Sequence, residues 1–561
     1  MSIDSTPQTL QIIAKDYYLW QAETFPVSSS YLGLHTWDDR LTNYSPGALS
    51  RQRSYLEATL DDVLSIKPEG WEKDDYIDWL LFRAQVEGAY YHDILLDESS
   101  TNPQVYVNEC SNAIFSLLKK DYAPAAVRAK AAAKRMAAMP ELIEQAKKNL
   151  TKPVKLFMKL AASSARALKP LFTESLMAIA CDLPAEERRN LEEKRDKALE
   201  ALKDFGEWLE GPLPGAQEFK PMGRDNYNFL LSHSLLLPYD ADELISLAKA
   251  ELVRARALES WLDDPGKANP DPSRSPRIPA TQQEFLKVYE SRQGEIIEHL
   301  KKKRLVTLPE SLGSFYIREL PAPFRPTSPG GFMNPPGLYD SDTSGFYFIP
   351  SYSPDSPNFY IRAAIEEPRP ILAHEGIPGH FLQISRAYAQ ANEIRKHHHD
   401  GVFVEGWALY TEEMLMRTGL YEHHSAGEGQ VLRLSRYRAA RIEVDVNLHT
   451  GTWSLDEAVE HFAAAGGLDR EAAEGEAAGA ATRPLQKITY TTGKYQLMGL
   501  LGRCRDKDGD TFRLGEFHDR LLSYGSLPVS ILEWIMLDNR TLLDRALEKR
   551  TETEVLFRCE A

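Results

Sequence analysis

The sequence predicts a mainly α-helical protein with a small β element, and three observations lead to this prediction. Apolar residues recur at three- and four-residue steps among charged residues through most of the first 320 residues, which is typical of amphipathic helices. Aromatic and β-branched residues are concentrated instead between residues 344 and 365, where strands are favoured. Hydrophobic residues make up 43% of the 561-residue chain, which is enough for a large core.

The first 320 residues are expected to be almost wholly helical. Pro140 and Pro153 should interrupt the longest helical stretch, because proline ends or kinks helices. The segment Asp263–Ala280 is rich in Pro and Ser and predicts a loop, and Leu320–Pro336 should also be irregular. The clearest helical periodicity covers residues 50–66, 74–97, 123–149, 153–182, 184–210, 240–262 and 283–303.

The second part of the chain begins with two candidate strands. Ser344–Ser351 and Asn358–Ile365 flank a turn-rich PDSP stretch, and they predict a β-hairpin or two strands of a small sheet. Ala463–Ala481 is compatible with either a helix or a loop. We therefore expect a helical N-terminal part, 1–320, and a second part, 321–561, within one continuous fold. Helical patterns return at 381–395, 403–418, 428–450, 455–464, 485–503 and from residue 512 onward.

Charge and hydropathy exclude several classes of partner. The formal net charge of -16 disfavours sequence-independent binding of nucleic acid, which requires an excess of Lys and Arg. No run of 18 apolar residues occurs, so we expect no membrane-spanning helix. The first residues lack a basic segment followed by an apolar stretch, which favours a cytoplasmic location. The oligomeric state is left open by the sequence.

Other reactive groups give no coherent pattern. The four cysteines are far apart and contain no C-x-x-C pair, which favours reduced thiols over disulfides or a cysteine zinc site. A G-x-S-x-G nucleophile elbow, a P-loop and a dinucleotide fingerprint are all missing from the sequence. The runs His397–His399 and His423–His424 are interpreted as polar loops, because consecutive side chains point in different directions. The cysteines are Cys110, Cys181, Cys504 and Cys559.

One motif does resemble a metal site, although its spacing is unusual. Zinc proteases commonly place two histidines four residues apart on a helix, with Glu after the first. Here His374 and His380 are six residues apart, which corresponds to roughly 600° of helical rotation, so a regular helix cannot direct both at one ion. Pro378 and the glycines at 376 and 379 favour a broken or bulged helix between them. Such an interruption would allow the two imidazoles to share a metal.

A catalytic zinc normally has three protein ligands and a water, so a third ligand is needed. Glu405 is the best candidate, because it lies in the apolar segment VEGWALY, where an unpaired carboxylate would be costly to bury. Glu412, seven residues later, shares its helical face. It is the competing ligand, an acid behind the ligands, or a solvated surface residue.

The strings AHEGIPGHFLQ and VEGWALYTEEM resemble domain-of-unknown-function family 885, which is grouped with gluzincin-like zinc metallopeptidases. The resemblance extends over most of the chain and is strongest between residues 336 and 500. It implies a helical body around a deep cleft. It also implies that His374, His380 and Glu405 bind one zinc ion, and that Glu375 is the catalytic base.

Two later strings add candidates. Arg441, Asp445 and His449 recur at four-residue steps along one helical face. His449 would donate to an oxyanion with Asp445 in support, and Arg441 would contact substrate; the alternative is a surface ion pair and a structural histidine. In Tyr490–Lys494, Tyr490 would polarise the scissile carbonyl and Lys494 would hold a substrate carboxylate. The alternative is a buried tyrosine and a solvated lysine.

These features together predict a zinc-dependent hydrolase, namely a metallopeptidase that cleaves short peptides as a carboxypeptidase or dipeptidase does. In this mechanism the metal activates water and Glu375 moves the proton. Two alternatives remain: hydrolysis of a small non-peptide amide at the same metal, and a helical binding protein with a vestigial site.

Overall fold

The computed structural model describes residues 4–181, 183–262, 279–321, 330–356, 358–422 and 425–560. The structure is 71% helical with one small sheet, which confirms the mainly α prediction. Three predicted segments lie wholly or partly outside the described residues: residues 263–278 of the expected loop Asp263–Ala280, residues 322–329 of the expected irregular stretch Leu320–Pro336, and the histidines at 423 and 424. None of the helices within the described ranges is long and apolar enough to cross a membrane.

Two compact units are present. Unit 1 comprises Met1–Phe219, Pro321–Ser328 and Pro336–Thr343, and unit 2 comprises the rest. The structure thus groups residues 220–320 with the C-terminal part, whereas the sequence places the division after residue 320.

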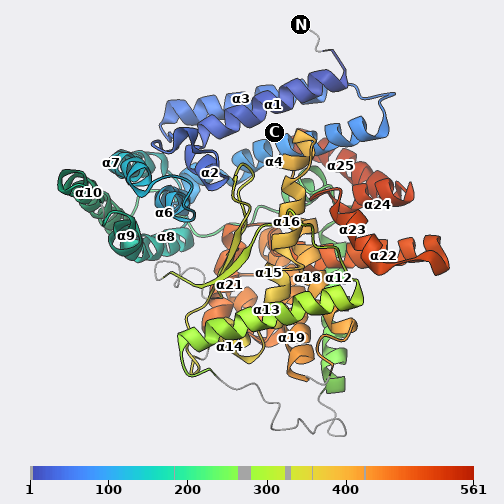
Figure 1. Cartoon of the computed structure of the whole chain (residues 1–561). Helices are drawn as coiled ribbons and strands as arrows, with labels where there is room; N and C mark the ends of the chain where they lie inside the picture. Colours follow the sequence, from blue (N-terminus) through green and yellow to red (C-terminus); the bar gives the residue numbers. More distant parts are fainter. Residues whose placement is uncertain are drawn as a thin grey trace. The chain divides into compact units, whose positions relative to one another are not determined.

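Unit 1 is an assembly of helices (Figure 1). Its core is formed by buried apolar side chains of α6, α7, α8 and α10, where alanines such as Ala132, Ala162 and Ala198 permit close helix packing. Pro153 separates α7 from α8 as expected, but Pro140 lies inside α7 and does not end it. The helices are α1 (Pro7–Thr24), α2 (Pro26–Tyr31), α3 (Pro46–Ser65), α4 (Lys73–Leu96), α5 (Glu98–Thr101), α6 (Gln104–Leu118), α7 (Ala125–Asn149), α8 (Lys155–Ala167), α9 (Leu176–Ile179) and α10 (Ala185–Glu210), with short helices η1 (His35–Trp37) and η2 (Leu171–Ser175).

Unit 2 contains the histidine motif and the sheet. Its first helices are α11 (Arg224–His233), α12 (Ala241–Leu262) and α13 (Gln282–Lys303). After the strands come α14 (Phe359–Glu366), α15 (Arg369–Glu375), α16 (His380–Tyr388), α17 (Glu393–His397), α18 (Gly401–Arg417), α19 (Ser425–Thr450), α20 (Leu455–His461), η5 (Phe462–Gly466), α21 (Arg470–Thr482), α22 (Thr489–Asp508), η6 (Gly509–Thr511), α23 (Leu514–Leu522), α24 (Val529–Leu537) and α25 (Thr541–Glu560).

The sheet has the order β1-β3-β2. It consists of β1 (Phe315–Glu319), β2 (Phe332–Asn334) and the fully buried central strand β3 (Gly345–Ile349). β1 runs parallel to β3, and β2 runs antiparallel to it. The sheet packs beside α16, since the rings of Phe315 and Phe381 lie 5.0 Å apart.

Two local predictions in this region are wrong. Asn358–Ile365 forms α14 rather than a strand, because the Asn358 side chain accepts hydrogen bonds from the backbone N–H groups of Tyr360 and Ile361 and so caps a helix. The stretch from residue 320 to 336, expected to be irregular, contains β2, which exists because β3 supplies its partner. The open alternative at Ala463–Ala481 is decided mostly for helix, as α21.

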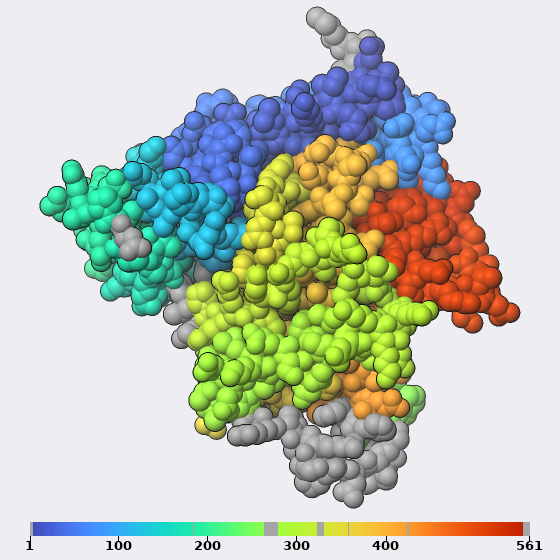
Figure 2. Space-filling model, viewed as in Figure 1, coloured from blue at the N-terminus to red at the C-terminus, as the bar shows by residue number. Residues whose placement is uncertain are grey.

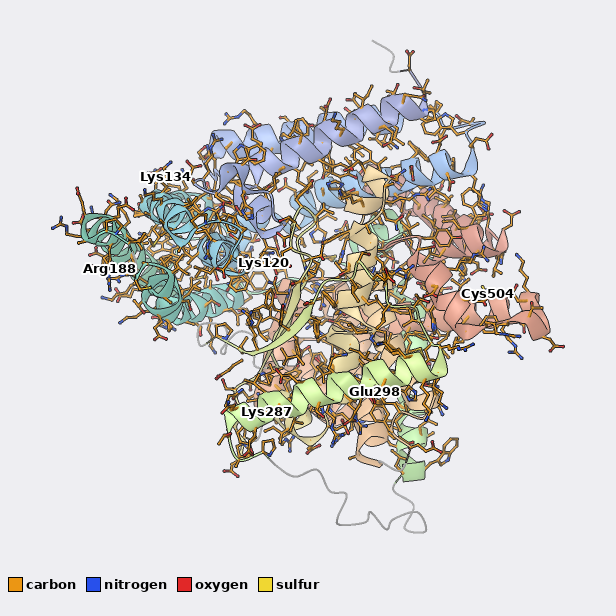
Figure 3. All side chains as sticks on the ribbon, viewed as in Figure 1. Lys120, Lys134, Arg188, Lys287, Glu298 and Cys504 are labelled. Carbon is orange, nitrogen blue, oxygen red and sulfur yellow. The ribbon has the colours of Figure 1, made fainter. Side chains whose placement is uncertain are left out.

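Helices α15 and α16 both pack on α18, and α18 packs closely on α22. A Cβ atom on Gly493 would lie 1.9 Å from the carbonyl oxygen of Val402, so the close approach of these two helices requires glycine there. Helix α13 packs on α15 and lies at the surface in Figure 2. Figure 3 shows Lys287 and Glu298 along α13 and Cys504 on α22; Cys110, Cys181 and Cys504 are free thiols, as expected.

Candidate metal centre

The two histidines of the motif stand on different helices. α15 ends at Glu375, α16 begins at His380, and the four residues between them form the predicted interruption. A Cβ atom on Gly379 would lie 1.9 Å from the His374 carbonyl oxygen, so the turn folds tightly back against α15. The imidazole centroids of His374 and His380 are consequently 4.6 Å apart.

Two side chains from other helices hold this turn. Gln293 of α13 donates a hydrogen bond from Nε2 to the Ile377 carbonyl oxygen at 3.1 Å. Trp407 of α18 donates from its indole N–H to the Pro378 carbonyl oxygen at 2.9 Å. Both carbonyls are freed by the interruption of the helix, so the surrounding helices replace the backbone bonds that the turn lacks.

Glu405 of α18 completes a group of three potential ligands. Its Oε2 lies 3.3 Å from His374 Nε2 and 3.2 Å from His380 Nε2. Two ligands about 2.0–2.1 Å from a tetrahedral zinc ion lie about 3.3–3.4 Å apart, so these distances fit two edges of a coordination tetrahedron. Oε2 is buried and accepts no hydrogen bond in a suitable direction. The donor set and the unsatisfied oxygen therefore both fit a divalent metal.

Glu412 lies on the opposite side of His374. Its Oε1 is 2.8 Å from His374 Nδ1 and 3.2 Å from Nη2 of Arg438 on α19. Because Glu412 contacts Nδ1, His374 presents Nε2 to Glu405 and His380. This geometry supports Glu405 over Glu412 as the third ligand, and it places Glu412 where it orients the histidine.

The ligand side chains and their neighbours shift one another's pKa values. Burial alone would raise the pKa of the Glu405 carboxyl, but the His380 and His374 imidazoles hold it well below its usual range. Burial would lower the pKa of His374, yet Glu405 and Glu412 raise it to about 9. Glu405 is therefore an anion, as a metal ligand must be.

Glu375 ends α15 directly after His374 and is partly exposed. Burial raises the pKa of the Tyr347 hydroxyl on β3, and the charges of Tyr289 and Glu375 raise it further, which places Glu375 near the sheet.

Tyr490 of α22 lies against the ligand group. Its ring stacks on His374 with centroids 6.0 Å apart, and Gln486 Nε2 donates to its hydroxyl at 3.1 Å. Burial raises the pKa of this hydroxyl to about 12, with a further contribution from Glu405. Tyr490 is therefore a neutral hydroxyl donor at ordinary pH, and it lies beside the ligand group.

Two further candidates, His449 and Lys494, have protein partners. His449 Nε2 lies 2.9 Å from the carbonyl oxygen of Ala480, and the Asp445 expected to support it instead accepts from Tyr227 and two backbone N–H groups. The Lys494 ammonium donates to Glu413 Oε2 at 3.0 Å and lies 3.3 Å from Glu251. A substrate carboxylate would have to displace these acids.

Arg441 contacts Tyr490, whose ring stacks on His374. Its guanidinium carbon lies 4.4 Å from the Tyr490 ring centroid, and its Nε is 3.4 Å from Glu476 Oε2. Arg438, which was not predicted from the sequence, lies one helical turn earlier on the same face of α19. The three-residue spacing of these arginines is the signal that would have revealed it.

His399 follows α17 and its side chain is exposed. The charges of Glu405 and His380 act on its imidazole, so it lies within electrostatic reach of the ligand group. Its backbone pairs with Ser526 in an isolated β-bridge.

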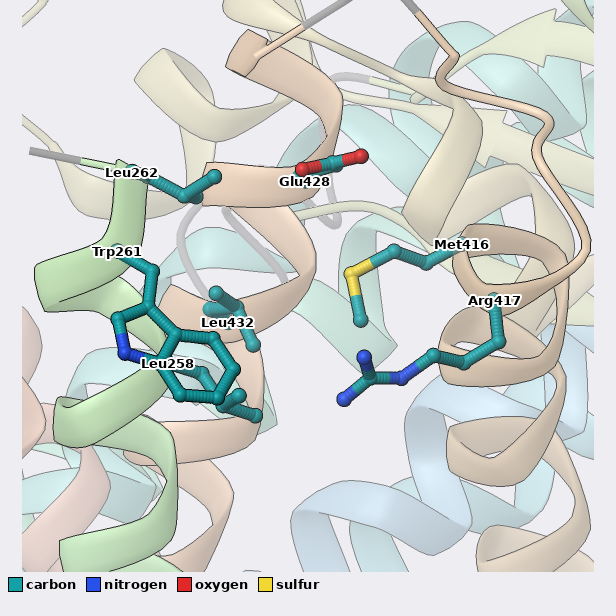
Figure 4. Close-up of a pocket in the computed structure, with 7 residues that line it drawn as sticks. All are labelled: Leu258, Trp261, Leu262, Met416, Arg417, Glu428 and Leu432. Carbon is teal, nitrogen blue, oxygen red and sulfur yellow. The ribbon is translucent and has the colours of Figure 1, made fainter. Parts of the chain in front are cut away.

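A separate hollow of about 250 Å³ lies between the end of α12 and the start of α19 (Figure 4). Trp261, Leu262 and Met416 line it together with Arg417 and Glu428. The described lining includes no member of the ligand group, so the hollow is not the metal centre.

The profile of domain-of-unknown-function family 885, described as bacterial protein of unknown function, matches residues 26–536. Two of the solved structures that resemble the chain are each described as a "putative lipoprotein". The one from Shewanella oneidensis, also described as of unknown function, has 20% identity and a TM-score of 0.74, covering 95% of this chain and all of that one. The one from Colwellia psychrerythraea has 18% identity and a TM-score of 0.72, covering 97% and 100%. None of the curated proteins compared with the chain matches it. At these identities the likeness shows the fold alone.

Proposed function

The chain belongs to domain-of-unknown-function family 885, and we propose that it is a zinc-dependent hydrolase of short peptides, related to the gluzincin-like metallopeptidases. One observation carries the proposal: the ligand atoms of His374, His380 and Glu405 lie within 4.8 Å of one another, with tetrahedral-edge distances to Glu405. Two imidazoles and a carboxylate form a ligand set of catalytic zinc sites.

When bound, zinc would polarise water and lower its pKa to about 7. His374, His380 and Glu405 would hold one ion per chain. Glu412 would fix the ring of His374 through Nδ1, where it lies at 2.8 Å. This supporting carboxylate favours a stable metal site over a chance cluster, because such partners orient metal-bound histidines.

Glu375 is the proposed general base. It follows a ligand directly, and its partial exposure leaves it open to solvent and substrate. In the reaction it accepts a proton from the attacking water and returns it to the leaving amine. Tyr490, kept neutral by its raised pKa, donates a hydrogen bond to the oxyanion that forms on the scissile carbonyl. We prefer Tyr490 to His449 in this role, since His449 contacts the Ala480 carbonyl.

The test has two parts. Metal content should be about one zinc per chain in the wild type, and it should be lost in His374→Ala and in Glu405→Ala but retained in His397→Ala, a histidine outside the group. Glu375→Gln should keep zinc and lose at least about 100-fold in the rate of hydrolysis of a panel of blocked and free dipeptides. Zinc retained by Glu405→Ala would refute the ligand set.

Activity on small non-peptide amides alone would support the second hypothesis, because the metal residues would be the same. A protein that takes up no zinc would favour a binding protein with a vestigial site.

A further inference from the structure

Two buried arginines beside the metal centre keep hydrogen-bond donors without acceptors. Arg438 and Arg441 are only 5% and 7% exposed. Nε and Nη1 of Arg438 and Nε of Arg441 have no hydrogen-bond partner among the described residues. Buried donors are almost always satisfied in folded proteins, so each exception requires an explanation. For an arginine, the usual missing acceptor is a carboxylate or a phosphate.

Both guanidinium groups lie near the ring of Tyr490, which also contacts the proposed ligand His374. Their carbon atoms are 5.5 Å and 4.4 Å from the centroid of the Tyr490 ring. The same ring stacks on His374 at 6.0 Å. An anion bound by these arginines would therefore lie close to a peptide bond placed at the metal.

The neighbouring carboxylates are already engaged. Glu412 Oε1 contacts both His374 and Arg438; its Oε2 lacks a partner but belongs to the same carboxylate. Glu476 accepts from Tyr360 at 2.7 Å and from Lys487 at 2.8 Å. Its 3.4 Å approach to Arg441 Nε is an ion pair without hydrogen-bond geometry. The positive charges of Arg438 and Arg441 are therefore only partly balanced by protein carboxylates.

We propose that Arg438 and Arg441 bind the C-terminal carboxylate of a short peptide substrate. This inference rests on the proposed function and narrows it to removal of the C-terminal residue. Each guanidinium can donate a charge-assisted hydrogen bond to a carboxylate from a nitrogen that has no partner among the described residues. The near-complete enclosure of both side chains favours a chain end over the middle of a longer peptide, because only an end can enter so closed a site.

The experiment compares N-acetyl-alanyl-alanine with its C-terminal amide by titration calorimetry on the full chain. Binding is measured after zinc has been removed with a chelator, so that a carboxylate cannot bind through the metal. The wild type should bind the acid at least about 10-fold more tightly than the amide, because charged hydrogen bonds are lost with the amide. Arg438→Lys and Arg441→Lys should each weaken binding of the acid by about 10- to 100-fold and leave the amide unchanged.

Arg436→Lys is the matched control. Arg436 lies on the same helix but donates to Glu259 at 3.0 Å and to the Ala465 carbonyl oxygen at 2.8 Å, so both ligands should bind as in the wild type. Equal wild-type binding of acid and amide would overturn the proposal, and this comparison does not depend on any variant folding. Unchanged acid binding in both arginine variants would overturn it as well.

Failure of the proposed function is separable from failure of this inference. A protein that discriminates acid from amide through the arginines, yet hydrolyses neither in the presence of zinc, would retain the carboxylate site and lose the hydrolase assignment. Hydrolysis of both acid and amide at equal rates would retain the hydrolase and exclude the carboxylate site.

Discussion

Glu412 Oε1 and His374 Nδ1 lie 2.8 Å apart in the interior of unit 2, where both side chains are almost fully buried. The contact leaves only Nε2 of His374 for the shared group with His380 and Glu405. Glu412 therefore determines which nitrogen of the histidine faces Glu405 and His380.

Glu412→Gln should weaken zinc binding by about 10- to 100-fold, because the amide is a poorer acceptor for the Nδ1 proton. Competition with a fluorescent chelator measures this change. Glu413→Gln is the control at the next position, since Glu413 pairs with Lys494 and Arg254 instead of the histidine. Equal zinc affinities in the wild type and Glu412→Gln would show that Glu412 has no orienting role.

Gly379→Ala should abolish the metal centre. The new Cβ would lie 1.9 Å from the His374 carbonyl oxygen and 2.3 Å from that of Ala373, and backbone atoms cannot yield as a flexible side chain can. We expect loss of stoichiometric zinc and a destabilisation of about 3 kcal/mol or more. Chemical unfolding and metal analysis would measure both effects.

The control is Gly475→Ala in α21, where a Cβ would meet no atom within 4 Å. This variant should be neutral or more stable by up to about 1 kcal/mol, because Ala favours a helix interior. Full zinc occupancy in Gly379→Ala would mean that the turn has a different conformation from the one described.

Tyr490→Phe separates catalysis from metal binding. The ring and its stacking on His374 would remain, so zinc content should not change. Loss of the hydroxyl donor should lower kcat by about 10- to 1000-fold with a smaller effect on KM. Steady-state kinetics would test this, and an unchanged kcat would transfer the oxyanion role to another residue.

The interruption between the two histidines was predictable because its causes are local. Pro378 and two glycines lie within seven residues, and the six-residue spacing excludes one regular helix. The three candidate metal ligands were predicted from the same strings, and their ligand atoms lie within 4.8 Å of one another in the structure. By contrast, the Glu412 contact depends on the packing of α18 against α15, and no local pattern encodes it.

The strand prediction failed where local pattern is ambiguous. A short aromatic and β-branched run fits a strand or a buried helix equally well, and at residues 359–366 the capping Asn358 decides for the helix. β2 was missed for the opposite reason, since three residues carry almost no periodicity and form a strand only beside β3. Arg438 was overlooked because a buried arginine looks the same in sequence as an exposed one.

A last prediction concerns pH. The Asp400 side chain caps α18 by accepting from the N–H groups of Val402 and Phe403, at 3.2 Å and 3.1 Å. Burial nevertheless raises the pKa of its carboxyl from 3.8 to about 7. The folded protein therefore holds this proton more tightly than the unfolded chain. The stability that Asp400 contributes is fully present below about pH 4 and is lost as the pH rises through 7.

Asparagine caps helices as well as aspartate does and does not titrate. Asp400→Asn should therefore gain stability relative to the wild type between pH 5 and pH 8, by about 1–3 kcal/mol at the upper end. Melting temperatures at each pH, measured with a chelator present, would show the difference widening. A difference that stays constant for Asp400→Asn from pH 5 to pH 8 would contradict the prediction. It would show that the Asp400 carboxylate is ionised throughout this range, and that the two backbone donors at the start of α18 fully stabilise its buried charge.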